Sequence, residues 1–156
     1  HTNGYSLARK IFFEVGGYGV EDKIPDLQKS VGMTLLEPHI NYTNHVLSIL
    51  KKGTMVNGIA HITGGGLIEN IPRVLPNGCS ASIQRNSWPS LDVFVAMQSI
   101  GNIEEEEMYR SFNMGIGMVF IVNDEDVSII SDTLKDLSPV YEIGKIVAGD
   151  GQVTIR

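Results

Sequence analysis

The spacing of apolar residues along the chain predicts several amphipathic helices. In the stretch SLARKIFFEV, residues 6–15, Ile11 and Phe12 recur at helical intervals with their apolar neighbours. The glycine-rich stretch that follows is expected to end this helix. The same helical spacing predicts further helices over residues 42–51, 90–101, 104–112 and 125–137.

Shorter apolar runs predict strands over residues 55–63, 80–85, 114–123, 140–149 and 152–156. The run 114–123 is almost continuously apolar, which is typical of a strand covered on both faces. An Asp-Gly pair separates the last two strands and favours a tight hairpin between them. Residues 20–38 show no regular pattern and are predicted to form a loop. We therefore predict an α+β fold in which helices pack on a mixed, largely antiparallel sheet.

Composition narrows the class of protein. The 156 residues are 42% hydrophobic and 19% charged, which suits a single globular domain over residues 1–156. A net charge of -6 argues against a nucleic-acid surface, and no apolar run approaches the ~20 residues that span a bilayer. A single cysteine, which excludes an intrachain disulfide, fits a reducing cytoplasmic setting. Because the chain opens on His1 rather than Met, we expect a piece of a longer protein.

The stretch AHITGGGLIENIPRVLP, residues 60–76, is the most informative motif for function. A predicted strand runs through His61 and Thr63 into three consecutive glycines, Gly64, Gly65 and Gly66, and then into a helix-like segment. Backbone N–H groups at such a helix start can hold a phosphate or carboxylate. The alternative is a tight turn that packs closely. The pattern is neither a dinucleotide fingerprint nor a P-loop.

Polar residues around this motif are candidates for chemistry. His61, near a strand end, is a candidate general base, and the alternative is a core histidine. Asn70 and Arg73 are spaced to share a helix side, where an amide and a guanidinium could bind an anion. The alternative for this pair is a helix cap and a surface ion pair.

A second polar cluster lies at the N-terminus. His1, Asn3 and Ser6 lead into the first predicted helix, where Asn3 or Ser6 is expected to cap. They form another possible anion-facing helix end, and ordinary capping is the alternative. Gly115 and Gly117, two apart, are expected to allow close approach of a helix. The sequence offers no set of residues with metal-ligand spacing, and we assign His39 and His45 no role.

Three stretches together resemble a known family. HTNGYSLARKI, AHITGGGLIENIPRVLP and EEEEMYRSFNMGIGMVFIV follow one another as in the C-terminal domain of the aminoimidazole ribonucleotide synthetases. These enzymes are the phosphoribosylformylglycinamidine cyclo-ligases of purine biosynthesis. The resemblance runs from His1 to the end of the chain, and the glycine block is its most specific part.

The resemblance implies a fold and a reaction. The domain is expected to form α/β/α layers that are partly ferredoxin-like. In the whole enzyme it pairs with an N-terminal ATP-binding domain, which is absent from this chain and supplies the dimer contact. The enzyme uses ATP and Mg²⁺ to cyclise formylglycinamidine ribonucleotide to aminoimidazole ribonucleotide. The chain alone is expected to be inactive.

The resemblance also implies site residues. His61 and His1 are the catalytic candidates, either of which could take the proton from the ring-closing nitrogen. The substrate- and phosphate-binding candidates that it implies are Asn3, Thr63, Gly64, Gly65, Gly66, Asn70 and Arg73. One stretch departs from the family, since EPHINYT stands where members read roughly EPTRIYV, and Ile40 replaces a basic residue.

Two alternatives to a catalytic half remain open. The first is a phosphate- or nucleotide-binding module that kept the fold without catalysis. The second is a paralogous ATP-dependent enzyme of the same superfamily. Intact His61 and glycines favour the catalytic reading, because a module freed from catalysis need not retain both.

Overall fold

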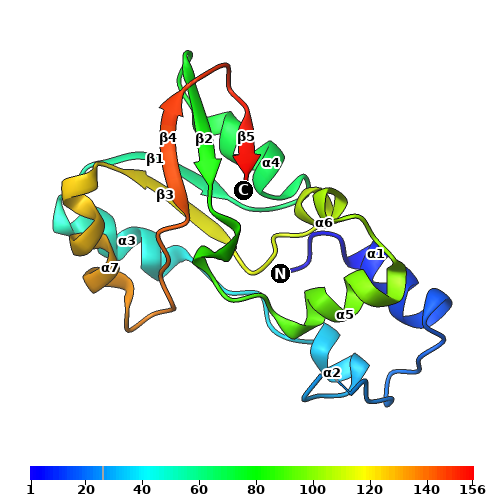
Figure 1. The fold of residues 1–156 in the computed structure, drawn as a ribbon. Helices are drawn as coiled ribbons and strands as arrows, with labels where there is room; N and C mark the ends of the chain where they lie inside the picture. The colour runs from blue at the N-terminus through cyan, green and yellow to red at the C-terminus, as the bar shows by residue number, and fades with distance from the viewer. Residues whose placement is uncertain (26) are drawn as a thin grey trace.

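The computed structural model describes residues 1–25 and 27–156, so residue 26, inside the predicted loop, lies outside the described residues. Figure 1 shows α1, α2 and α5 gathered at one end of the molecule and the strands at the other. The helical elements are α1 (Tyr5–Arg9) with its continuation η1 (Lys10–Val15), α2 (Val31–Leu35), α3 (Thr43–Lys52), α4 (Gly66–Asn70) with η2 (Ile71–Val74), η3 (Arg85–Ser87), α5 (Asp92–Gly101), α6 (Glu105–Ser111), η4 (Asp124–Asp126) and α7 (Val127–Leu134). The strands are β1 (Val56–His61), β2 (Cys79–Ile83), β3 (Met118–Val122), β4 (Gly144–Ala148) and β5 (Val153–Ile155).

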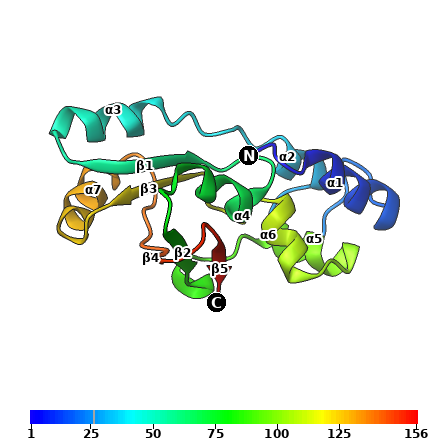
Figure 2. The same ribbon diagram turned by 90° about the horizontal axis from the view of Figure 1, so that it is seen from above.

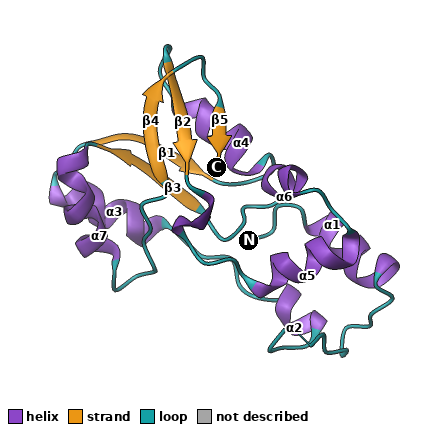
Figure 3. Ribbon diagram, in the orientation of Figure 1, coloured by secondary structure: helices purple, strands orange, loops and turns teal. Residues whose placement is uncertain are grey.

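The predicted α+β class is confirmed, but the described strands form two sheets instead of one (Figure 3). β1 pairs antiparallel with β3, and β2 lies between β4 and β5. β2 runs antiparallel to β4 and parallel to β5. β3 was predicted to be covered on both faces, yet all its residues are only half-buried, because they line a hollow.

The predicted hairpin at the chain end is wrong, because β4 and β5 lie on opposite edges of β2. The connection instead crosses the start of β2. The N–H groups of Gly149 and Gly151 donate to the carbonyl oxygens of Gly78 and Cys79, at 2.9 Å each. A side chain at Gly149 would overlap Ser80, so glycine permits the close crossing. Local turn propensity was outweighed by pairing with both free edges of β2.

The loop predicted over residues 20–38 contains α2. Ser30 begins this helix, since its hydroxyl accepts a hydrogen bond from the N–H of Met33 at 3.3 Å. Val31 is fully buried. A five-residue helix completes little more than one turn, which is too short for the apolar periodicity to reveal it.

Three apolar clusters hold these elements together. The first joins the helices of one end around Phe12 and Phe112. The second lies between β2 and α4 and includes Leu67 and Trp88. The third packs Ile49 of α3 against α7 beside the β1–β3 pair. Figure 2 shows α3 on one side of this pair and the β4-β2-β5 sheet on the other.

Candidate functional site

Three histidines and a tyrosine meet at one end of the β1–β3 pair. His1 lies in the N-terminal segment, His61 ends β1, and His39 and Tyr42 lie in the segment that precedes α3. The His1 and His39 rings stack with centroids 4.2 Å apart and an interplanar angle of 21°. The His61 ring lies 5.7 Å from His39 and 6.4 Å from His1. We call these four residues the histidine cluster.

The backbone of β3 explains why the cluster forms there. The N–H of Ile62 donates to the carbonyl oxygen of Gly117 at 2.9 Å, which extends the β1–β3 ladder past His61. Gly117 is buried, and a side chain on it would overlap both the His1 ring and the Tyr42 hydroxyl. The predicted role of Gly117, close approach of a helix, is therefore wrong, because the His1 and Tyr42 side chains fill that space.

Tyr42 fixes the orientation of His1. Its hydroxyl lies 2.6 Å from Nε2 of His1, a hydrogen bond in which the phenol donates when that nitrogen is unprotonated. Burial raises the pKa of the Tyr42 phenol above its usual value, which keeps the donor protonated. The bond leaves Nδ1 of His1 for other partners.

Tyr42 also contacts a buried histidine on its other side. Its ring meets His45 edge-on at 5.2 Å. Nε2 of His45 lies 3.1 Å from the Ser138 hydroxyl, and Nδ1 has no hydrogen-bond partner among the described residues. Both Tyr42 and His45 line a second hollow, mostly apolar, between β3, α7 and β4.

The histidine cluster opens to solvent. His39 and His61 are exposed, and they line a shallow hollow together with Tyr42 and Met118. Apolar side chains of α3 complete one wall of the hollow, among them Val46 and Leu47. His61 is therefore accessible to a ligand instead of being a satisfied core histidine.

The glycine turn is open at one end and sealed at the other. Thr63 and Gly64 are exposed, and nothing lies near the side-chain position of Gly64. Gly66 is buried, adopts a φ of 57°, and would overlap the carbonyl oxygen of Tyr109 with any side chain. Close packing of α4 on α6 therefore requires glycine at position 66.

The amides of this turn differ in what they can bind. The N–H of Gly66 donates to the carbonyl oxygen of Thr63 at 3.0 Å, so it serves the turn itself. The Glu69 carboxylate lies against Gly65, where it would repel an anion. α4 has only five residues, which limits the positive potential at its start.

Asn70 and Arg73 do not share a side. Asn70 is buried, and its side-chain amide donates to the carbonyl oxygens of Gly64 at 3.1 Å and Gly66 at 2.8 Å. The Thr63 hydroxyl donates to the Asn70 side-chain oxygen at 3.2 Å. Arg73 is exposed, because Pro72 ends α4 at Asn70 and a 3₁₀ turn follows. Asn70 thus holds the glycine turn in shape.

Asn3 also has a positioning role. Its amide donates to the carbonyl oxygen of Ser111 at the end of α6, at 3.3 Å, which anchors the segment that carries His1. The predicted cap by Asn3 or Ser6 is wrong, since Gly4 in a left-handed conformation precedes α1 without a side-chain bond. A side chain at Gly4 would overlap Phe112, so packing decides this helix start.

Sequence reasoning missed His39 and Tyr42. Both lie in EPHINYT; the departure of this stretch from the family pattern was the available signal for His39, whereas Tyr42 matches that pattern. Periodicity could not find them, because neither residue belongs to a regular element.

The described residues do not fit a magnesium site. Mg²⁺ prefers carboxylate and phosphate oxygens, whereas the cluster consists of imidazoles and a phenol. Over residues 1–25 and 27–156, no three His, Cys, Asp or Glu are arranged to hold a metal ion. In the same part of the chain no helix has the length and apolar character needed to cross a membrane.

These features define an α+β domain whose exposed polar site lies at the end of a strand pair, beside a glycine turn. The chain belongs to the family of AIR synthase related proteins, C-terminal domain, whose model matches residues 1–156.

Curated relatives agree with this family. The chain is 49% identical over 151 residues to the phosphoribosylformylglycinamidine cyclo-ligase of Geotalea daltonii, covering 96% of the chain and 43% of that relative. It is 47% identical over 156 residues to the cyclo-ligase of Caldanaerobacter subterraneus subsp. tengcongensis, covering 99% of the chain and 46% of the relative. For the Trichlorobacter lovleyi cyclo-ligase the identity is 50% over 147 residues, covering 94% and 42%. The chain thus spans less than half the length of these relatives.

Proposed function

We propose that the chain is the C-terminal part of a phosphoribosylformylglycinamidine cyclo-ligase and forms one side of its active cleft. The observation that carries the proposal is the identity of 47–50% to named cyclo-ligases over nearly the whole chain. The proximity of His1 to His61, which lines an open hollow, supports it. The missing N-terminal half, as an ATP-binding domain, would form the other side.

The proposed substrate is formylglycinamidine ribonucleotide. ATP would transfer its γ-phosphoryl group to the formyl amide oxygen and release ADP, so that this oxygen, otherwise a poor leaving group, can depart as phosphate. The amidine nitrogen then attacks the formyl carbon, phosphate leaves from that carbon, and the nitrogen loses a proton. The protein's task is to hold two weakly reactive groups together and to accept that proton.

We assign the proton acceptor to His61. Nε2 of His1 is occupied by the Tyr42 hydroxyl at 2.6 Å, whereas His61 is exposed to the hollow. A neutral imidazole accepts a proton near pH 7. His1, held by Tyr42, is proposed to orient the reacting amidine.

We propose that phosphoryl oxygens meet the open end of the glycine turn, at Thr63 and Gly64, away from the Glu69 carboxylate that lies against Gly65. Asn70 supports them by holding the backbone in place. Arg73, exposed on the following turn, is proposed to bind an anion at the rim. Gly66 and Asn3 contribute by positioning, through the α6 contacts described above.

The N-terminal half is the proposed partner, and Mg²⁺ would reach the cleft with ATP and residues of that half. The whole protein is proposed to be a homodimer through the same half, and to act in the cytoplasm. A hybrid protein tests the proposal. It joins the N-terminal portion of the Geotalea daltonii cyclo-ligase to this chain.

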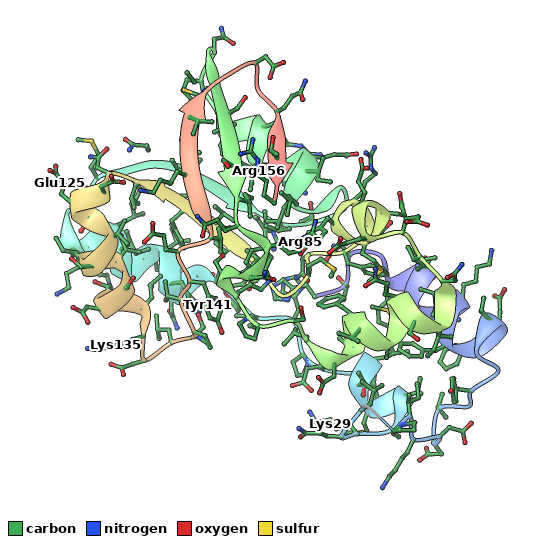
Figure 4. The ribbon with its side chains drawn as sticks, in the orientation of Figure 1. Lys29, Arg85, Glu125, Lys135, Tyr141 and Arg156 are labelled. Carbon is green, nitrogen blue, oxygen red and sulfur yellow. The ribbon has the colours of Figure 1, made fainter. Side chains whose placement is uncertain are left out.

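The hybrid is expected to catalyse ATP-dependent ring closure, measured as aminoimidazole formation, while the chain alone does not. His61→Ala should lower the rate by about 100-fold, the usual size of a general-base contribution. Glu125→Ala, on an exposed position of η4 just before α7 (Figure 4), is the control and should leave the rate unchanged. An unchanged rate in His61→Ala would contradict the assigned base.

A folded hybrid that binds phosphate without turnover would favour the non-catalytic module. Turnover of a different ATP-dependent reaction would favour the paralogous enzyme.

A further inference from the structure

The stacked pair of His39 and His1 is the feature that the proposed function leaves unexplained. Burial does not account for it, because His39 is exposed. The rings lie nearly parallel, with centroids 4.2 Å apart. Each imidazole ring carries an N–H group, so the pair offers hydrogen-bond donors that an anion can accept.

The surroundings of the pair favour an anion over a cation. The third ring, His61, lies 5.7 Å from His39 and meets it edge-on. Glu37, two residues before His39, is paired with Lys29 and is not a partner of the rings. His39 and His61 therefore line an open hollow to which imidazole N–H groups can donate, and His1 stacks on His39 beside it.

We propose that His39 is a substrate-binding residue, which stacks on His1 and donates an imidazole N–H to a phosphoryl group in the hollow. His39 would then supply a hydrogen-bond donor for the phosphoryl group, which the neighbouring Ile40 side chain lacks. That the ligand is a phosphorylated ribonucleotide rests on the proposed function. The contact between His39 and a phosphoryl group is inferred independently of that function.

A purely structural role for His39 predicts something different from a binding role. Phenylalanine keeps a flat ring that can stack on His1, but it has no N–H donor. Arginine stacks on a flat ring and carries several donors. His39→Phe and His39→Arg therefore separate stacking from donation.

The test measures binding of inorganic phosphate, ribose 5-phosphate and ATP to the 156-residue chain and its variants by calorimetry. Loss of one hydrogen bond to a charged group should weaken phosphate binding by about tenfold in His39→Phe. His39→Arg should bind within about threefold of the parent chain. Asn57→Ala, at an exposed position of β1, is the control and should bind like the parent. Circular dichroism confirms that each variant is folded.

The comparison of ligands identifies the source of the phosphoryl group. Tighter binding of ribose 5-phosphate than of inorganic phosphate assigns the contact to the substrate's phosphate, and tighter binding of ATP assigns it to the nucleotide. Equal binding by His39→Phe and the parent chain would overturn the inference, as would absence of phosphate binding by the parent.

The same variants in the hybrid keep the two proposals distinguishable. A raised KM with an unchanged kcat in His39→Phe supports the inference, whereas unchanged KM and kcat overturn it while the cyclo-ligase proposal stands. If the hybrid shows no turnover but binds phosphate in a way that depends on His39, the proposed function is wrong and the inference about His39 stands.

Discussion

At the scale of single residues, a missing side chain shapes the histidine cluster. Gly117 lies beneath the His1–Tyr42 hydrogen bond, in the space that any larger residue would occupy. Gly66 plays a comparable role under Tyr109. The residues that make the site possible are therefore partly glycines with no chemistry of their own.

Gly117→Ala should separate His1 from Tyr42. The new methyl group overlaps both side chains, so we expect a loss of about 1–3 kcal/mol in the free energy of unfolding, measured by urea denaturation. Gly64→Ala is the matched control, because open space surrounds that position, and its stability should change by less than about 0.5 kcal/mol. Equal stability of the two variants would show that Gly117 is not tightly packed.

Tyr42 and Tyr109 should make stability depend on alkaline pH. Burial raises the pKa of both phenols above the usual value near 10, and for Tyr109 Arg85 lowers it in part while Glu105 raises it. The folded state therefore holds these protons more tightly than the unfolded state. Their contribution is fully present below pH ~10 and is lost as pH rises through the folded pKa values.

Urea denaturation between pH 8 and about pH 11 measures this loss. Tyr42→Phe should reduce the alkaline slope of the unfolding free energy, because one of the two shifted phenols is removed. A slope that is the same in the variant would mean that Tyr42 titrates alike in both states.

At the scale of elements, α3 has two different faces. Ile49 is 1% exposed and packs with Ile130 and Leu134 of α7, whereas Leu50 is 56% exposed. The helix thus joins α7 through one face and borders the open hollow through another, where Leu47 lies. The packing of α3 fixes the segment that carries His39 and Tyr42.

Ile49→Ala should lower the free energy of unfolding by about 2–5 kcal/mol, because it leaves a cavity between α3 and α7. Leu50→Ala removes a similar number of atoms from the exposed face and should change stability by less than about 0.5 kcal/mol. Thermal or urea denaturation of both variants measures the difference. Similar values for the two would contradict the packing of α3 described above.

At the scale of the whole molecule, the C-terminal strand β5 completes one edge of the β4-β2-β5 sheet. β5 pairs with β2, and its Val153 and Ile155 pack on the second apolar cluster. The backbone N–H of Arg85 donates to the carbonyl oxygen of Arg156 at 2.7 Å, and Figure 4 labels the two residues close to the centre of the molecule. Five residues at the end thus secure a sheet that begins near the middle of the chain.

Deleting residues 152–156 should therefore lower the free energy of unfolding by about 3 kcal/mol or more, the sum for two apolar side chains that lose their burial. Thr154→Ala changes an exposed residue of the same strand and should have an effect below about 0.5 kcal/mol. Chemical denaturation of both proteins provides the measurement. A deletion that leaves stability unchanged would show that β5 adds nothing to the sheet.

Much of the local structure could be predicted from sequence, because apolar periodicity reports which face of a segment is buried. The helix around Phe12, the strand that ends in His61 and the helix that contains Ile49 were predicted in this way and are confirmed. α2 and the β4-β2-β5 order were not predicted. The first is too short for periodicity, and the second depends on which edge of β2 each strand reaches.

The sequence by itself determined the α+β class, most elements and, through the family motifs, that His1 and His61 are the residues to examine. Only the tertiary structure decided that His39 stacks on His1, that Tyr42 holds His1, and that Gly117 makes room for them. The physical reason is that periodicity records whether a residue is buried, while contacts between distant segments depend on the space that the backbone leaves between them.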